Sequence, residues 1–405
     1  MRGRQQPGRQ QLRHEGRRRR REPLRVGLVC GRPSTELDGV AGYVERLAQE
    51  LPAAGVEPVV VPCGPDARAA AAAGRTLAKL DLDAVHVQFA PSMYGFRGSI
   101  GLLPLVLPRS VPLLTTLHEY GSWELPIARP RPLRSVYPWS ERHVVLDRET
   151  GFLVPRSRAV VVTNPVHLAT LQNRFHGHVP GRHIPIGANV EVAREASPDG
   201  SREQIRTQLG LEPGTTLLAF FGFVHPVKGL RYLFEAMAQL RDEGEALHLA
   251  VIGGFESLAL PGQEASDFRA ELEGRVGALG LKGQVTFTGF QPPEEVSRWL
   301  LASDLGVLPF TAGVTTKSGS LLTMLAHGLP VVATAGEDES VEDGETCVAV
   351  HSVRDAEALA DGLRRAQRDG GLRRRVARQG KALAARRSWQ DIARRHADVY
   401  REVAG

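Results

Sequence analysis

A cationic side chain follows one predicted strand at a position that suits phosphate binding. Lys228 comes after a strand, a glycine turn and a proline-bearing loop that also carries Phe223 and His225. A lysine at the mouth of a parallel sheet places a point charge close to phosphate oxygens. The segment therefore predicts a phosphate contact at Lys228. A solvated surface lysine is the alternative interpretation.

A second group of small polar residues follows the predicted strand that ends at Pro309. Ser318, Gly319 and Ser320 stand at the start of a predicted helix, and Lys317 precedes them. Backbone N–H groups at a helix start, together with the positive end of the helix dipole, can hold a diphosphate. The alternative interpretation is that Ser318 only caps the helix.

Two further residues lie where strands of the first half of the chain end. His118 follows an apolar strand, at the edge that faces the cleft in a doubly wound sheet. Gly39 lies in Asp38-Gly39-Val40-Ala41-Gly42-Tyr43, where a glycine lets backbone N–H groups approach a phosphate. An ordinary turn glycine explains Gly39 equally well. The segment lacks the full GxGxxG pattern, which disfavours a nicotinamide enzyme.

The elements that must position these residues alternate between strand and helix. Short apolar runs separated by helical stretches predict parallel βαβ units with both sheet faces covered. The predicted strands are 24–30, 56–61, 85–89, 113–117 and 160–163, then 217–221, 248–252, 285–287, 305–308 and 331–333. The predicted fold is therefore α/β, with two Rossmann-like doubly wound domains in sequence.

Length and charge restrict the organisation further. The 405 residues favour two domains. Residues 1–22 hold nine Arg and two Glu, a net of +7, so the remainder of a chain of net charge +6 carries −1. A generally basic nucleic-acid surface is not supported. We expect a disordered basic tail over residues 1–23, with contact to an anionic membrane surface as the alternative to a solvated tail.

The remaining boundaries come from composition. We expect an N-terminal domain over 24–190, a second domain over 191–387 and a final helix over 388–405. Segment 119–155 is rich in Pro, Arg and aromatic residues, and it is predicted either to bind the acceptor or to pack irregularly. Three scattered cysteines and the lack of a long apolar run favour a cytoplasmic protein, with peripheral contact at the inner membrane face left open.

Taken in order, these motifs resemble the retaining glycosyltransferases of the GT-B fold, the glycosyltransferase family 4-like or "glycosyl transferases group 1" proteins. The resemblance covers nearly the whole chain after residue 23. The matching segments are Asp83-Ala84-Val85-His86-Val87-Gln88, Thr116-Leu117-His118, Ile184-Pro185-Ile186-Gly187-Ala188-Asn189-Val190, Phe221-Gly222 with Lys228-Gly229, Ala326-His327-Gly328-Leu329-Pro330-Val331-Val332, Val341-Glu342-Asp343-Gly344-Glu345 and Ser388-Trp389.

The resemblance implies that the two domains bind different substrates. The N-terminal domain takes the acceptor, the C-terminal domain takes the nucleotide sugar, and the last helix crosses back to the N-terminal domain. It also implies that Gly39 lies near the donor phosphate and His118 near the sugar. Lys228 would contact the diphosphate, with the helix start at 318–320 beneath it.

The chain departs from the family pattern at three positions. Phe223 stands where the family usually has an arginine, and His225 is nearby. Thr315 and Thr323 stand where the family has two glutamates that hold sugar and ribose hydroxyls. Threonine can still form hydrogen bonds, but without charge each contact is weaker. Lys317 compensates in charge for the missing arginine in this interpretation.

The sequence thus predicts a retaining, metal-independent transfer of a sugar from a nucleoside diphosphate sugar to an acceptor hydroxyl. Glycan, lipid-linked and small-molecule acceptors are all open, and no cofactor is expected. No pair of acidic residues is placed to hold a metal. Two alternatives remain: a catalytically silent GT-B protein that binds a nucleotide sugar or partners an active transferase, and a GT-B isomerase acting on a nucleotide sugar.

Overall fold

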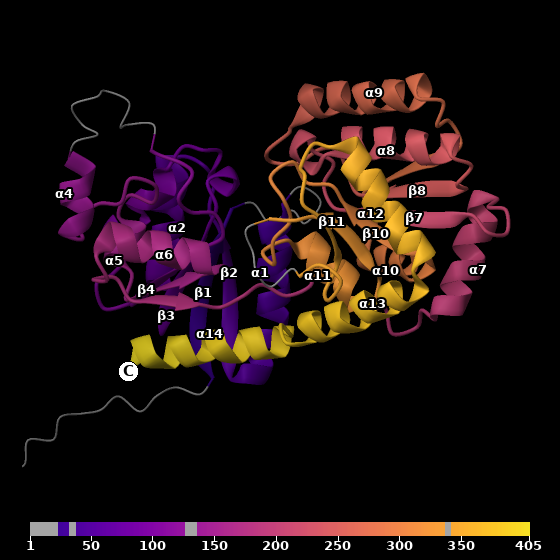
Figure 1. The fold of residues 1–405 in the computed structure, drawn as a ribbon. Helices are drawn as coiled ribbons and strands as arrows, with labels where there is room; N and C mark the ends of the chain where they lie inside the picture. Colours follow the sequence, from indigo (N-terminus) through magenta and orange to yellow (C-terminus); the bar gives the residue numbers. More distant parts are fainter. Residues whose placement is uncertain (1–22, 32–37, 126–135, 337–341) are drawn as a thin grey trace, which may run out of the picture.

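The computed structural model describes residues 23–31, 38–125, 136–336 and 342–405. It contains two parallel six-stranded sheets, each in its own lobe (Figure 1). The strands of the first sheet are β1 (Leu24–Cys30), β2 (Val56–Pro62), β3 (Ala84–Phe89), β4 (Leu113–Leu117), β5 (Ala159–Val162) and β6 (Gly181–His183). Those of the second are β7 (Thr216–Phe221), β8 (Leu247–Ile252), β9 (Val285–Gly289), β10 (Leu305–Leu308), β11 (Val331–Thr334) and β12 (Val348–Val350).

Both sheets are doubly wound. The first has the order β2-β1-β3-β4-β5-β6 and the second β12-β11-β10-β7-β8-β9. The direction of winding therefore reverses between β1 and β3 in one sheet and between β7 and β10 in the other. Ligands of open parallel sheets bind outside the carboxyl ends of the strands at such reversal points. The two loops that the sequence analysis singled out, after β7 and after β10, flank the second of these points.

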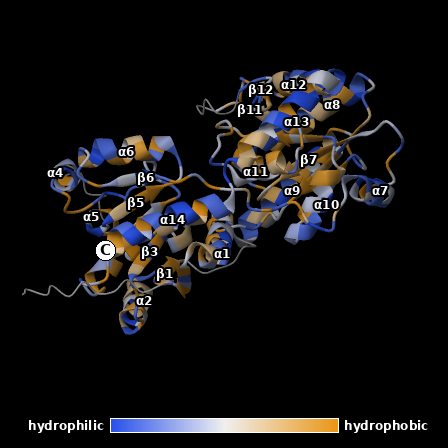
Figure 2. Cartoon of the chain, turned by 90° about the horizontal axis from the view of Figure 1, so that it is seen from below, coloured by the Kyte–Doolittle hydropathy of each residue, from blue (hydrophilic) through white to orange (hydrophobic). Residues whose placement is uncertain are grey.

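Helices cover both faces of each sheet. In the first lobe they are α1 (Gly39–Glu50), α2 (Ala67–Lys79), α4 (Val136–Arg142), α5 (Leu153–Arg156) and α6 (Pro165–Phe175). In the second they are α7 (Pro198–Leu209), α8 (Leu230–Asp242), α9 (Gly262–Ala278), α10 (Pro293–Ala302), α11 (Gly319–Ala326), α12 (Ala356–Arg368) and α13 (Gly370–Ala385). Figure 2 shows apolar strands inside both lobes and hydrophilic outer helix faces, as amphipathic helices on a buried sheet require.

The last helix, α14 (Trp389–Ala404), returns to the first lobe (Figure 1). Trp389, Ile392 and Tyr400 are at most 2% exposed and belong to the hydrophobic core of the N-terminal sheet. The indole N–H of Trp389 donates to the carbonyl of Ala188, 2.6 Å away, where the chain first crosses between the lobes. The predicted fold, including the crossing helix, is confirmed.

Several elements differ from the sequence-based expectation. The polar segment 188–202, which spans the expected domain boundary after residue 190, contains the start of α7, which Ser197 caps through the amide of Gly200. Strands β6 and β12 and helix α6 were not predicted. Each short strand has only three residues, so it shows no useful apolar period. Residues 1–22 of the expected tail lie outside the described residues.

Candidate active site

A cleft with a volume of about 920 Å³ lies between the carboxyl ends of the two sheets. Nine of the residues predicted from the sequence line it: Gly39, His118, Phe223, Lys228, Thr315, Lys317, Ser318, Gly319 and Ser320. They come from loops up to 281 positions apart in the chain, so only the folded chain brings them together. The cleft is large enough for a ligand of drug size or above.

Gly39 forms the N-terminal residue of α1 on the first-lobe wall. The carboxylate of Asp38 caps the helix by accepting from the amide of Val40 at 2.9 Å. A Cβ added at Gly39 would meet no atom within 4 Å. Packing inside the protein therefore does not require glycine here. The open space beside Gly39 belongs to the cleft, whose lining also includes Asp38, Val40 and Gly42.

His118 directly follows β4, and its backbone amide donates to the carbonyl of Phe89 at 2.9 Å. Its Nε2 atom lies 2.9 Å from Oε1 of Gln88, and its ring packs edge-on against Tyr43 with centroids 4.7 Å apart. Burial, and then the neighbouring histidines 396 and 167, lowers the pKa of His118 to about 3. The imidazole is therefore neutral at physiological pH and acts through hydrogen bonds rather than charge.

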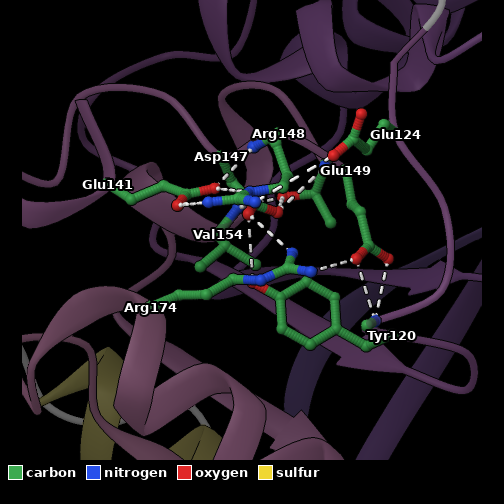
Figure 3. A network of polar contacts seen from close by, with 10 residues as sticks. Tyr120, Glu124, Glu141, Asp147, Arg148, Glu149, Val154 and Arg174 are labelled. Atoms are coloured by element: carbon green, nitrogen blue, oxygen red, sulfur yellow. Dashed lines mark hydrogen bonds and ion pairs between the residues drawn. The ribbon is translucent and has the colours of Figure 1, made fainter. Parts of the chain in front are cut away.

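Residues 120 and 121, which follow His118 closely, are held by a buried ionic network (Figure 3). The amide of Gly121 donates to both carboxylate oxygens of Glu149, at 2.9 and 3.0 Å. Arg174 on α6 pairs with Glu149 at 2.5 Å and with Asp147 at 3.4 Å, and both carboxylate side chains are 0% exposed. The Tyr120 hydroxyl donates to Asp147 at 3.0 Å. The first part of the predicted acceptor segment is thus fixed in place.

The guanidinium of Arg174 also lies over the Tyr120 ring, 4.6 Å from its centroid. The sequence analysis missed this network because Glu149 and Arg174 lie 25 positions apart and form no local pattern. Residues 126–135 of the same acceptor segment lie outside the described residues. The acceptor role of the segment stays a prediction.

Two glycines shape the loop that carries Lys228 on the second-lobe wall. Gly222 has φ +132°, and a Cβ there would lie 2.5 Å from the Ser320 hydroxyl. Gly229 has φ +73°, and a Cβ there would lie 1.8 Å from the carbonyl oxygen of Pro309. Both positions require glycine because a side chain would be strained and would clash. This close packing brings the loop after β7 against the loop after β10.

The Lys228 ammonium lies 3.7 Å from the centroid of the Phe310 ring. Burial, and then the charge of Lys317, lowers the pKa of Lys228 from 10.5 to about 8. Among the described residues, no carboxylate forms an ion pair with either lysine. Glu119 lines the same cleft and interacts electrostatically with Lys317 without forming an ion pair. The two lysines, neither of them in an ion pair, form a part of the cleft suited to an anion. The aromatic support from Phe310 was not predicted, although the strand end at residues 309–310 was.

The start of α11 lies beside these lysines. The Ser318 hydroxyl caps the helix by accepting from the amide of Leu321 at 3.3 Å, so the capping interpretation holds for this side chain. The cap does not use the amides of Gly319 and Ser320, which lie in the first turn, where N–H groups have no partner within the helix. These two amides remain available to a phosphate, while Ser318 itself fixes the helix start.

Thr315, Thr323 and His225 differ in whether they line the cleft. Thr315 lines the cleft, whereas Thr323 is fully buried. The Thr323 hydroxyl lies 3.4 Å from the amide of Val190, which donates to it. His225 is not among the lining residues; its Nδ1 accepts from the amide of Val227 at 3.3 Å, which shapes the turn before Lys228. A contact from either Thr323 or His225 to a ligand stays a prediction.

Residues 215–369 match the family model described as glycosyl transferases group 1. This match covers most of the second lobe, from β7 to α12. The relatives of the chain include an alpha-D-kanosaminyltransferase of Streptomyces kanamyceticus, 26% identical over 76% of this chain and 75% of that protein. A D-inositol 3-phosphate glycosyltransferase of Nocardia farcinica is 33% identical over 52% of this chain but only 45% of its own length.

Solved structures show the same fold at low identity. HepE of Anabaena, in complex with UDP and glucose, superposes on this chain with a TM-score of 0.70 at 16% identity, over 94% of this chain and all of that one. Sucrose-phosphate synthase of Thermosynechococcus elongatus gives 0.69 at 20% identity, over 94% and 98%. These likenesses establish that the chain has the GT-B fold.

Two features of the described residues concern metal binding and membrane insertion. No group of three or more His, Cys, Asp or Glu side chains in the described part of the chain could hold a metal ion. None of the helices in the described parts of residues 23–405 is long and apolar enough to cross a bilayer.

Proposed function

We propose that the protein is a glycosyltransferase that moves a sugar from a nucleoside diphosphate sugar to an acceptor hydroxyl, with retention and without a metal ion. The observation that carries the proposal is the presence of two cleft-lining lysines, Lys228 and Lys317, beside the start of α11, with neither in an ion pair among the described residues. In this proposal residues 191–387 hold the nucleotide sugar and residues 24–190 hold the acceptor. The complex of HepE, a protein of the same fold, with UDP and glucose supports the choice of donor class.

The chemical task is to stabilise the departing diphosphate, which gains negative charge as the glycosidic bond breaks. Lys228 donates to a phosphate oxygen, and the amides of Gly319 and Ser320 donate to others. Fixed N–H dipoles and an ammonium can stabilise a developing anion without reorganisation. The diphosphate raises the pKa of Lys228 above its value of about 8 in the empty cleft, because an adjacent anion favours the charged ammonium.

On the opposite wall, neutral His118 contacts the transferred sugar. The acceptor hydroxyl approaches from the side of α1 and of Gly121, which Glu149 holds in place. Retention follows if the acceptor attacks the face that the diphosphate leaves. The departing phosphate then takes the proton of the acceptor hydroxyl, and the new glycosidic bond forms as the old one breaks. No protein nucleophile is required by this sequence of events.

Turnover of a panel of nucleoside diphosphate sugars tests the proposal. Release of free nucleoside diphosphate, dependent on an added acceptor, is expected for at least one donor, and it should persist in excess chelator. Proton NMR of the product should show the anomeric configuration of the donor. An inverted product, or activity abolished by chelation and restored by magnesium or manganese, would contradict retention or metal independence respectively.

The absence of both family glutamates favours one competing function, a silent protein that binds a nucleotide sugar. Thr315 and Thr323 cannot supply the charged contacts to sugar and ribose that carboxylates make. The two functions differ in one measurement. A silent protein would bind nucleoside diphosphate, with the thermal stabilisation that this implies, but would release none from any donor with any acceptor.

A further inference from the structure

A buried polar chain, not used in the mechanism above, connects His118 to the last helix. It begins at Gln88 on β3, whose side chain is 0% exposed. Oε1 of Gln88 lies 2.9 Å from Nε2 of His118. Its Nε2 atom lies 3.2 and 3.3 Å from the two ring nitrogens of His86. The Tyr94 hydroxyl also donates to the Gln88 carbonyl at 2.9 Å, which fixes the strand at this residue.

His86 is held in turn from two sides. Its Nδ1 atom lies 2.7 Å from the Tyr400 hydroxyl on α14, and its Nε2 atom lies 2.7 Å from the Thr116 hydroxyl on β4. His86 is 0% exposed, and burial lowers its pKa well below the ordinary value, so the ring is neutral. The amide of Gln88 is therefore packed against a fixed ring and cannot rotate freely.

We propose that Gln88 is the positioning residue that fixes the tautomer of His118, with the proton on Nε2 and the lone pair of Nδ1 directed to the cleft. An amide carbonyl oxygen only accepts hydrogen bonds. Its partner on His118 must therefore carry a hydrogen. Among the described residues, none bonds to Nδ1 of His118, and His118 lines the cleft. This inference rests on the proposed function for its ligand, a hydroxyl of the transferred sugar.

The fixed tautomer decides what His118 can do. A neutral ring with a free Nδ1 lone pair accepts a hydrogen bond from a sugar hydroxyl, but it cannot protonate the leaving group. The opposite tautomer would present an N–H, to which the oxygen of a sugar hydroxyl would have to act as the acceptor. Since tautomer choice is set by the hydrogen bond that the other ring nitrogen makes, replacing Gln88 releases the ring to either form.

The tautomer itself can be measured without turnover. Nitrogen-15 NMR of the full chain labelled at histidine, with the His118 signals assigned by comparison with His118→Ala, is expected to show a protonated Nε2 and an unprotonated Nδ1. A protonated Nδ1 in the wild-type protein would overturn the inference, and would do so even if the proposed transfer reaction is correct. Conversely, a failure to find any turnover would leave this measurement valid.

Turnover then tests the consequence through a double-mutant cycle. Gln88→Met, which keeps the length but removes the acceptor, is expected to lower kcat by about 10- to 100-fold, the size of loss typical when a hydrogen-bond partner that orients a functional histidine is removed. Its affinity for UDP, measured by calorimetry, should be unchanged. In the His118→Ala background the same change should alter kcat by less than about twofold, since residues that act as a unit are not additive.

A control separates positioning from general loss of stability. Thr286→Val removes a partly buried hydrogen bond of 2.9 Å to His248 between β8 and β9, away from His118. It is expected to lower the melting temperature without changing kcat. If Gln88→Met lowers kcat equally with and without His118, Gln88 does not act through His118 and the inference fails. If Gln88→Met does not fold, the NMR result on the wild-type chain decides alone.

Discussion

Replacing Lys228 with methionine is expected to stabilise the empty protein. The pKa of this lysine falls from 10.5 to about 8 because burial, and then Lys317, disfavours the charged form. At about 1.4 kcal/mol for each pH unit between these two values, the charged ammonium disfavours the folded state by about 3 kcal/mol. Methionine keeps the apolar stem and a favourable contact with the Phe310 ring. An increase of about 1–3 kcal/mol in the free energy of unfolding follows.

The linkage between protonation and folding determines the sign and the pH range of this stabilisation. The folded-state pKa is the lower one, so the penalty is fully present below pH 8. It fades as the pH rises from about 8 to 10.5, because only the unfolded chain then retains the proton. Urea unfolding of both proteins at pH 7 should show the full difference. At pH 9.5 the difference should shrink to about 1 kcal/mol.

The same substitution should weaken the binding of a nucleoside diphosphate. Losing a charge-assisted hydrogen bond costs about 1.5–3 kcal/mol, or about a 10- to 150-fold rise in the Kd for UDP by calorimetry at pH 7. The matched control is Lys282→Met, at an exposed lysine between α9 and β9, which should change neither quantity. The reasoning is refuted if Lys228→Met is less stable than the wild type at pH 7, or binds UDP equally well.

Three further outcomes are expected. Arg174→Met should lower the free energy of unfolding by about 3–5 kcal/mol, because it leaves two buried carboxylates without their cationic partner. If urea unfolding shows a loss below about 1 kcal/mol, the network is not important for stability. Thr315→Glu, on the cleft lining, should tighten binding of a donor sugar in calorimetry, whereas Thr323→Glu at a fully buried position should lower the melting temperature. An unchanged melting temperature for Thr323→Glu would show that residue 323 reaches the cleft. Deleting residues 1–22 should leave turnover of a freely diffusing acceptor unchanged, and a large drop in that assay would contradict a dispensable tail.

Much of the fold follows from apolar runs that the sequence displays directly. Leu24–Cys30 and Leu305–Leu308 are strands with the predicted bounds, since buried parallel strands read as continuous apolar segments. Strand β6, Gly181–His183, has a partly exposed glycine, arginine and histidine at the sheet edge. This segment is extended because it pairs with β5, and the local sequence gives no signal of that pairing.

Some residues of the candidate site could likewise be predicted from the local sequence, and others could not. Lys228 and the helix start at 318–320 could be predicted because each combines a chemical group with a local strand or helix boundary. The role of Gln88 could not, because it depends on a side chain 30 positions away and on a ring held by the last helix. Thr323 shows the limit of spacing arguments. Its position on α11 was predictable, but its burial depends on packing against residue 190.

The crossing of α14 has a consequence for how the chain is made. During synthesis the first lobe emerges from the ribosome before residues 389–404 have been added to the chain. Trp389, Ile392 and Tyr400 are nevertheless part of the core of that lobe. Until they arrive, the nascent first lobe exposes the apolar surface that α14 later covers, a state prone to aggregation. The first lobe therefore completes its folding last, after the second lobe has formed. Expressed alone, residues 24–190 should be poorly stable, and adding the α14 peptide in trans should rescue them.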